Sequence, residues 1–327
     1  MSLAPFIHAM GRGPSRARSL TREEAGEAMR LILAGEAAPE GVGALLMLMR
    51  YRGEIAPEIA GFVDAMRARL APWQGLTPAL DWPSYAAGRS RGLPWFLAAA
   101  RLVADAGYPV LLHGWNSHQN PVADVRAALG AFDIPLTRSP DAARQALVER
   151  GIVYVPLEDL DPEIFRLLRL REILGLRSAV NTSCRMLNPG GAAASVQGVF
   201  HPSYRELQQD AGALLGQRDM IVLKGGGGEF ERHPGKPIAL YGLRGGQAFE
   251  ITANPLWDHA RRLADPAADP EHLTAVWSGQ RHDPFAEVTI TGTAAAALLC
   301  LGAAETMSEA EDQARTLWSA RKPARAA

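Results

Sequence analysis

DWPSYAAGRSRGLPWFLAAARLVADAGYPVLLHGW, from Asp81 to Trp115, is the stretch that decides the fold. The run from Leu97 to Val103 is rich in helix formers, and Pro94 suits the first turn of a helix. Gly107 ends this helix, and the residues after it extend as a strand. The pattern therefore predicts a strand, a loop, a helix and a second strand, as in a parallel α/β sheet. Because free N–H groups at the start of such a helix attract anions, the loop in front of it is expected to bind one. The candidate anion-binding residues are Ser84, Tyr85, Gly88, Arg89, Arg91 and Gly114.

The composition is that of an ordinary globular protein of 327 residues, 47% of them hydrophobic. A net charge of −1 excludes attraction of nucleic acid by bulk charge alone. Cys184 and Cys300 cannot form a disulfide framework or a four-cysteine zinc site, so we expect a cytoplasmic protein. The apolar run from Ala294 to Ala304 is about half of the ~20 residues that a membrane helix needs, so no membrane association is expected.

The chain divides into two parts of different character. Residues 1–71 carry three helical patterns, the first of them introduced by a capping box at Thr21 and Glu24. Residues 72–83 are rich in proline and form a linker, and strands alternate with helices from residue 84 onward. We therefore expect an α/β protein: a small all-helical N-terminal domain (1–71) and a larger α/β domain (84–327) with a central, mostly parallel sheet.

Several local features are also predicted. The first 20 residues are basic and turn-rich, which indicates an N-terminal arm. Helices are expected around Leu256 and from Thr293 to Leu301, and a second capping box at Ser308 and Glu311 is expected to start a terminal helix. The run Gly225 to Gly228 favours a turn at the end of a strand over a phosphate loop.

Arginines are concentrated in two segments. Between Arg166 and Arg185 there are five arginines and one acidic residue, Glu172, which gives this segment a local charge of +4. Two explanations stay open, the exposed face of an amphipathic helix and a surface that binds phosphates. The candidate nucleic-acid-binding residues are Arg12, Arg16, Arg18, Arg166, Arg169, Arg177 and Arg185.

Three segments resemble anthranilate phosphoribosyltransferase and its pyrimidine nucleoside phosphorylase relatives. Leu20 to Leu70 is similar to the N-terminal helical domain of that family, and Leu111 to Ser117 resembles its Lys-His-Gly-Asn-Arg segment. Arg171 to Arg177, followed by Asn181, resembles its Arg-x-x-Leu-Gly-x-Arg-Thr-x-x-Asn segment. The resemblance implies a helical domain joined in space by a helix near residues 162–175, a homodimer formed through the helices, and an interdomain cleft. His113, Arg171 and Asn181 are the residues that it would place in the cleft.

Departures from the family pattern fall on its phosphate and metal motifs. The glycine-rich Gly-Thr-Gly-Gly-Asp loop is replaced by the segment from Ser84 to Arg89, in which Gly88 alone is glycine. The lysine and asparagine of the second segment are Leu112 and Trp115 here. The adjacent acidic residues that hold magnesium are separated, as Glu229 and Glu231. We therefore expect no cofactor, with magnesium at these two glutamates only if the protein is an enzyme.

One branch of the family, the YbiB-type proteins, is similar at Gly11 to Gly13 and at Pro83 to Tyr85. That branch is associated with nucleic-acid binding. The sequence thus predicts a homodimer that binds nucleic acid without sequence preference and lacks the parental transferase activity. The alternative is a pentosyl transferase with a changed substrate, in which Arg171 holds a carboxylate or base and Asn181 orients it. A continuous positive groove would favour the first interpretation, and an isolated positive pocket the second.

Overall fold

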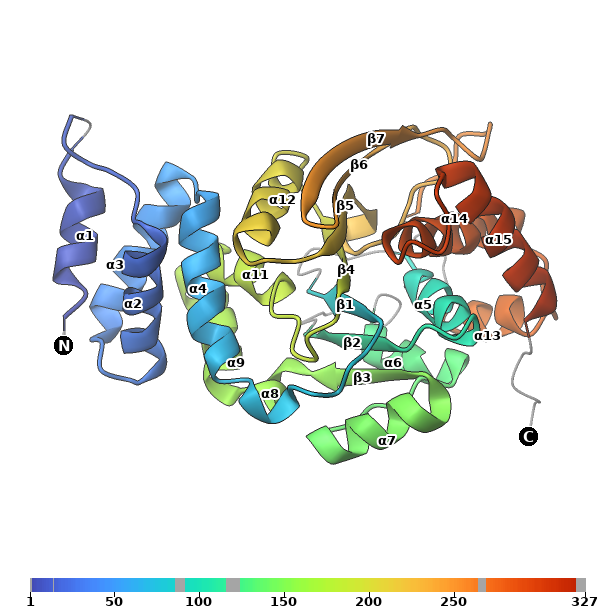
Figure 1. Ribbon diagram of the computed structural model, residues 1–327, viewed down its shortest axis with the longest axis horizontal. Helices are drawn as coiled ribbons and strands as arrows, with labels where there is room; N and C mark the ends of the chain where they lie inside the picture. Colours follow the sequence, from blue (N-terminus) through green and yellow to red (C-terminus); the bar gives the residue numbers. More distant parts are fainter. Residues whose placement is uncertain (1, 14, 86–91, 116–123, 264–268, 322–327) are drawn as a thin grey trace.

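A seven-stranded sheet forms the centre of the molecule (Figure 1). The computed structural model describes residues 2–13, 15–85, 92–115, 124–263 and 269–321. The strand order is β3-β2-β1-β4-β5-β6-β7, with the first five strands parallel and the last two forming an antiparallel hairpin. The strands are β1 (Leu80–Ser84), β2 (Val110–Gly114), β3 (Ile152–Pro156), β4 (Ala194–Val199), β5 (Asp219–Lys224), β6 (Ile238–Arg244) and β7 (Gln247–Ala253).

Helices cover both faces of the sheet and form a separate N-terminal layer (Figure 1). The N-terminal helices are α1 (Ala4–Gly11), α2 (Arg22–Leu33), α3 (Pro39–Arg52) and α4 (Ala56–Ala68). Those that follow are α5 (Phe96–Asp105), α6 (Val125–Ala128), α7 (Pro140–Arg150), α8 (Leu157–Leu160), α9 (Pro162–Arg169), α10 (Arg171–Leu174), α11 (Ala179–Arg185), α12 (Tyr204–Leu214), α13 (Glu271–Trp277), α14 (Pro284–Cys300) and α15 (Met307–Ala320). Short 3-10 turns are η1 (Ala71–Trp73), η3 (Leu129–Phe132) and η4 (Gly226–Gly228). The predicted fold class, a small helical part followed by a larger α/β part with a mostly parallel sheet, is confirmed.

Two hydrophobic cores lie on opposite faces of the sheet, because successive strand residues point to opposite sides. Leu112 and Tyr154 belong to the core that includes α5, α13, α14 and α15. Leu111 and Val153 belong to the core that includes the N-terminal helices α2, α3 and α4. The N-terminal helices thus share one continuous core with a face of the sheet.

The predicted capping box at the start of α2 is present. Thr21 Oγ1 accepts a hydrogen bond from Glu24 N at 3.2 Å, and Glu24 accepts one from Thr21 N at 3.0 Å. The apolar residues along one face of α4, among them Phe62 and Met66, are fully buried. These helices therefore form where local capping and the apolar pattern agree.

The structure differs from four local predictions. Residues 4–11 form helix α1 inside the predicted arm, residues 254–263 contain no helix around Leu256, and the terminal capping box uses Thr306 and Glu309. Helix α14 begins nine residues earlier than predicted, at Pro284, and continues through β-branched residues such as Ile290. Burial against the sheet and α5 outweighs their low helix propensity.

In the described part of the chain no helix is both long and apolar enough to span a membrane.

Candidate functional site

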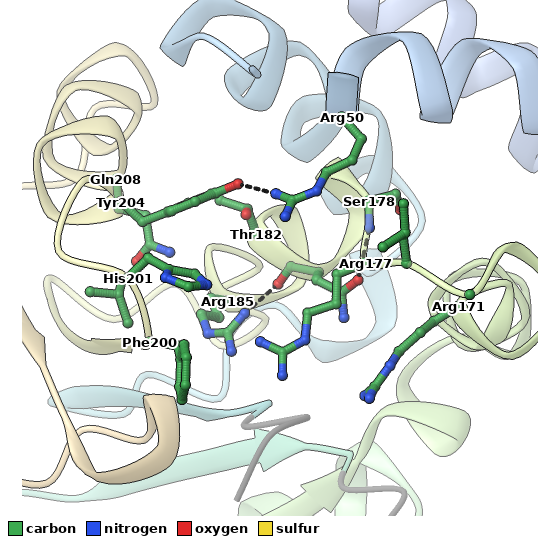
Figure 2. A pocket seen from close by; sticks show the side chains of 14 residues that line it. Arg50, Arg171, Arg177, Ser178, Thr182, Arg185, Phe200, His201, Tyr204 and Gln208 are labelled. Carbon is green, nitrogen blue, oxygen red and sulfur yellow. Dashed lines mark hydrogen bonds between the residues drawn. The ribbon is translucent and has the colours of Figure 1, made fainter. Parts of the chain in front are cut away.

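A cavity of about 290 Å³ lies between the N-terminal helices and the end of β4 (Figure 2). Four arginines line it: Arg50 from α3, Arg171 from α10, Arg177 from the loop after α10, and Arg185 from α11. Its described lining residues include no aspartate and no glutamate. The cavity is therefore a positively charged pocket, which we call the arginine pocket.

The hydrogen-bond partners of Arg50 and Arg185 are electrically neutral. Arg185 is 7% exposed and donates hydrogen bonds to the backbone carbonyls of Asn181 and Tyr85, both at 2.8 Å. Arg50 donates to the Tyr204 hydroxyl at 2.8 Å, and that hydroxyl donates to Glu54 at 3.0 Å. The Tyr204 phenol thus connects the Arg50 guanidinium to the Glu54 carboxylate.

The surroundings of Arg177 disfavour its positive charge. Burial, together with the nearby Arg185, Arg171 and Arg50, lowers the pKa of Arg177 to about 10. Its guanidinium lies 5.9 Å from the centre of the Phe200 ring. The positive electrostatic field of the neighbouring arginines, which disfavours the charged form of Arg177, favours binding of an anion.

The remaining walls combine apolar and aromatic groups. Val199 and Phe200 lie at the carboxyl end of β4, where ligands bind in α/β sheets, and Tyr204 comes from α12. Phe200 is 46% exposed, and His201 packs edge-on against it with ring centres 4.9 Å apart. A ligand that has a flat apolar part beside its anionic group is suited to these walls.

The candidate Asn181 lies in this pocket, but its side chain also has a structural task. Its Oδ1 accepts a hydrogen bond from the Ser178 backbone N–H at 3.2 Å and so caps α11. Asn181 is 5% exposed. The structure therefore brings Arg171, Asn181, Arg177 and Arg185 together, as lining of one cavity.

The candidate residues at the ends of β1 and β2 are packed in the interior. Tyr85 and His113 form a hydrogen bond of 2.8 Å between the phenol and Nδ1, and Nε2 of His113 lies 3.1 Å from an oxygen of Asp81. Ser195 donates to the other oxygen of Asp81 at 2.8 Å. All of these side chains are at most 2% exposed, so His113 does not line the arginine pocket. The candidates Gly88, Arg89 and Arg91 lie outside the described residues.

Gly114 and Ser84 have structural reasons for their positions. A Cβ on Gly114 would lie 1.9 Å from the Ser84 carbonyl oxygen, so no other residue fits this approach of β1 and β2. The Ser84 hydroxyl donates to Glu229 at 3.0 Å. Gly114 is therefore explained by the close approach of β1 and β2, and Ser84 by its hydrogen bond to Glu229.

The start of α5 holds an anion from the protein itself. The Phe96 backbone N–H donates to a carboxylate oxygen of Glu231 at 3.0 Å. Glu231 is fully buried, and Glu229 is 1% exposed. The expectation that the N-terminus of this helix attracts negative charge is consistent with this contact, because a carboxylate satisfies the helix N-terminus as an external phosphate would.

The other predicted nucleic-acid-binding arginines are mostly paired. Arg18 forms an ion pair with Glu24 at 2.6 Å, Arg166 with Glu163 at 2.8 Å, and Arg169 with Glu172 at 2.9 Å. Arg12 and Arg16 are exposed near the N-terminus. Arg166 and Arg169 each pair with a glutamate three positions away on the same helical segment, and these pairs reduce the positive charge of the 166–185 segment.

Most of the chain matches models of a glycosyl transferase family. The helical bundle domain of the family matches residues 4–70, and its a/b domain matches residues 96–320. The chain belongs to this glycosyl transferase family. Its relatives include the anthranilate phosphoribosyltransferase of Methylobacterium nodulans, 31% identical over 94% of this chain and 91% of the relative. That of Thermomicrobium roseum is 30% identical over 90% of this chain and 87% of the relative. These relatives give no support to the expectation that the parental activity is lost.

Solved structures of the family share the fold. Anthranilate phosphoribosyltransferase from Thermus thermophilus aligns over 97% of this chain and 94% of its own, with a TM-score of 0.80 and 25% identity. The Saccharomyces cerevisiae enzyme in complex with PRPP and Mg aligns over 97% and 93%, with a TM-score of 0.77 and 14% identity. The expectation of no cofactor is wrong for this family, because this member is solved with magnesium bound.

Glu229 and Glu231 supply the kind of ligand that magnesium prefers in such enzymes, one or two carboxylates completed by substrate phosphates. The described residues contain no group of three histidines, cysteines or acids suited to a metal. The assignment of Glu229 and Glu231 as magnesium ligands stays a prediction. The Ser84 hydroxyl donates to Glu229, and the Phe96 N–H donates to Glu231. A magnesium ion bound to these carboxylates would compete with the two hydrogen bonds.

Sequence reasoning missed the pocket residues Arg50, Phe200, His201, Tyr204 and Gln208. Arg50 meets Tyr204 across 154 positions of sequence. No local pattern marks either residue, since each is one polar or aromatic side chain on an ordinary helix. Their connection exists only after α3 and α12 pack on either side of the cavity.

Proposed function

We propose that this protein is a phosphoribosyltransferase whose acceptor binds in the arginine pocket. The observation that supports this proposal best is the concentration of four arginines around one cavity without a lining carboxylate. The paired state of Arg18, Arg166 and Arg169 is less favourable to a continuous nucleic-acid groove. An isolated positive pocket is the pattern expected of a transferase.

The acceptor is an aromatic carboxylate of the type named in the relatives, anthranilate. Arg171 and Arg177 hold its carboxylate, and Phe200 lies against its ring. The chemistry needs orientation of the acceptor amine and stabilisation of a ribosyl cation, so positioning and electrostatics supply most of the rate. Magnesium held by Glu229 and Glu231 would neutralise the pyrophosphate that leaves.

The test is turnover of phosphoribosyl pyrophosphate, Mg²⁺ and anthranilate, followed by loss of anthranilate fluorescence and release of pyrophosphate. Arg171→Gln is expected to raise the KM for anthranilate about tenfold or more, because a charge-assisted hydrogen bond is lost. Arg144→Gln, which removes an exposed ion pair with Asp141 on α7, is the matched control and keeps the wild-type KM. Absence of anthranilate-dependent pyrophosphate release rejects the proposal.

A second candidate function is nucleic-acid binding by a homodimer, as in the YbiB-type branch. It is favoured by Arg12 and Arg16, which are exposed and form no ion pair among the described residues. Binding would weaken steeply with salt, by a log–log slope of about 0.9 for each neutralised phosphate of duplex DNA. Fluorescence anisotropy with labelled DNA tests this candidate, and light scattering tests the dimer. No binding at ~50 mM salt, or equal binding by an Arg12→Glu, Arg16→Glu variant, rejects it.

A further inference from the structure

The arginine pocket contains more positive charge than one carboxylate can neutralise. Arg185 has two neutral backbone carbonyls as partners, and Arg50 has the neutral Tyr204 hydroxyl. Arg177 forms no ion pair within the described chain. A buried guanidinium without a counter-charge is costly, so a ligand that neutralises a single arginine leaves the others uncompensated.

The protein supplies little compensation from behind the pocket. Burial lowers the pKa of Arg185, and the field of Glu229 offsets this only in part. Glu54 reaches Arg50 only through the Tyr204 hydroxyl. Neither glutamate lines the cavity. The missing negative charge must therefore come from the ligand.

The positive groups enter the cavity from separate segments. Figure 2 shows Arg50 coming from α3 at the top of the view and Arg171 from α10 at the side. Arg177 and Arg185 extend into the region below Arg50. Charges supplied from several walls suit two anionic groups at different positions on one ligand better than one group at a single point.

We infer that the arginine pocket accepts a ligand with two negative charges on a flat, aromatic frame. Phe200 and Tyr204 provide the aromatic surface for the frame, and the four arginines receive the two acidic groups. This inference rests on the proposed function for the role of the pocket, and it extends the preferred ligand from a monoanion such as anthranilate to an aromatic dianion. The second acidic group is a carboxylate or a phosphate, since guanidinium binds both by paired hydrogen bonds.

The experiment measures binding by calorimetry at pH 8 in the absence of phosphoribosyl pyrophosphate and Mg²⁺. The probes are benzamide, benzoate, isophthalate and phenyl phosphate, which carry zero, one, two and about two negative charges. Isophthalate or phenyl phosphate is expected to bind about tenfold or more tightly than benzoate. Tighter binding of isophthalate identifies a dicarboxylate site, and tighter binding of phenyl phosphate identifies a site for a phosphate ester.

Variants separate the pocket from general charge effects. Arg177→Gln is expected to reduce the affinity for the preferred dianion to that for benzoate, while Arg144→Gln retains the preference. If Arg177→Gln does not fold, as judged by its thermal melt, Arg50→Gln takes its place. Equal affinity for benzoate and both dianions overturns the inference, as does an unchanged preference in the folded pocket variant.

These results are distinguishable from failure of the proposed function. A dianion preference that is removed by Arg177→Gln, without any pyrophosphate release, supports the inference and rejects the anthranilate transferase. Turnover of anthranilate with no preference for dianions supports the transferase and rejects the inference.

Discussion

At the scale of single residues, the positions that resemble ligand-binding motifs are largely engaged by the protein itself. Tyr85 is buried against His113, and Gly114 is a glycine because the Ser84 carbonyl leaves no room for a Cβ. The arginines divide in the same way, with Arg166 paired to Glu163 and Arg177 directed to the pocket. The residue type thus predicted the charge and shape of each side chain. The groups that the side chain contacts determined whether it stabilises the fold or lines the pocket.

Tyr85→Phe is expected to destabilise the protein by about 1–3 kcal/mol, because it leaves the buried Nδ1 of His113 without its phenol partner. Urea unfolding measures the change in the free energy of unfolding. Tyr51→Phe, at a residue that is 90% exposed, is the control and is expected to have almost no effect. Equal stability of the two variants would show that the Tyr85–His113 bond contributes nothing.

At the scale of elements, buried carboxylates control where helices begin. Glu231 accepts from the first turn of α5, and Asp283 caps α14 by accepting from Ala286 N at 3.2 Å. Asp283 also receives a bidentate pair from Arg261 at 2.8 and 2.9 Å and lies 3.0 Å from His272. Burial raises the pKa of Asp283, but the hydrogen bonds from Arg261 and His272 outweigh this and lower it to about 2.

This carboxylate gives the fold an acid-sensitive contact. Because the folded pKa lies below the ordinary value, the stabilisation is present above about pH 4 and is lost as the pH falls toward 2. Asp283→Asn is expected to cost about 2 kcal/mol at pH 7 and to lose less stability than wild type between pH 4 and pH 2. Chemical denaturation across this pH range measures it. Asp141→Asn, at an exposed carboxylate, keeps the wild-type profile; an identical profile for Asp283→Asn would refute the assignment.

At the scale of the whole molecule, the N-terminal helices and the sheet act as one packed body. Helix α4 packs against α2 on one side and against α11 and α12 on the other, with Ile59, Phe62 and Val63 fully buried. Arg67 donates from α4 to the carbonyls of Met186 and Leu187 at 2.8 and 3.0 Å. The arginine pocket lies at this junction, since Arg50 belongs to the helical part and Arg185 to the other.

We therefore expect a single cooperative unfolding transition, coincident by far-UV circular dichroism and tryptophan fluorescence. The helical segment 1–71 expressed alone is expected to be largely unfolded, because the apolar faces of its helices lose their partners on the sheet. Calorimetry of the full chain checks the first expectation. Two separated transitions, or a stable isolated segment, would show that the shared core is not what stabilises these helices.

The sequence by itself determined the fold class, the helical N-terminal part, most helix starts and the glutamates at the end of the sheet. These features follow from apolar periodicity, capping residues and turn residues, which act over a few positions. Through a family resemblance it also named Arg171 and Asn181, together with His113, as cleft residues, and the first two line the arginine pocket. Only the tertiary structure decided the surroundings of the pocket arginines, since Arg50 meets Tyr204 and Arg185 meets the Tyr85 carbonyl across long stretches of sequence. The physical reason is that charge at a site depends on partners across the fold and on burial, whereas local sequence specifies backbone conformation and the face that each side chain takes.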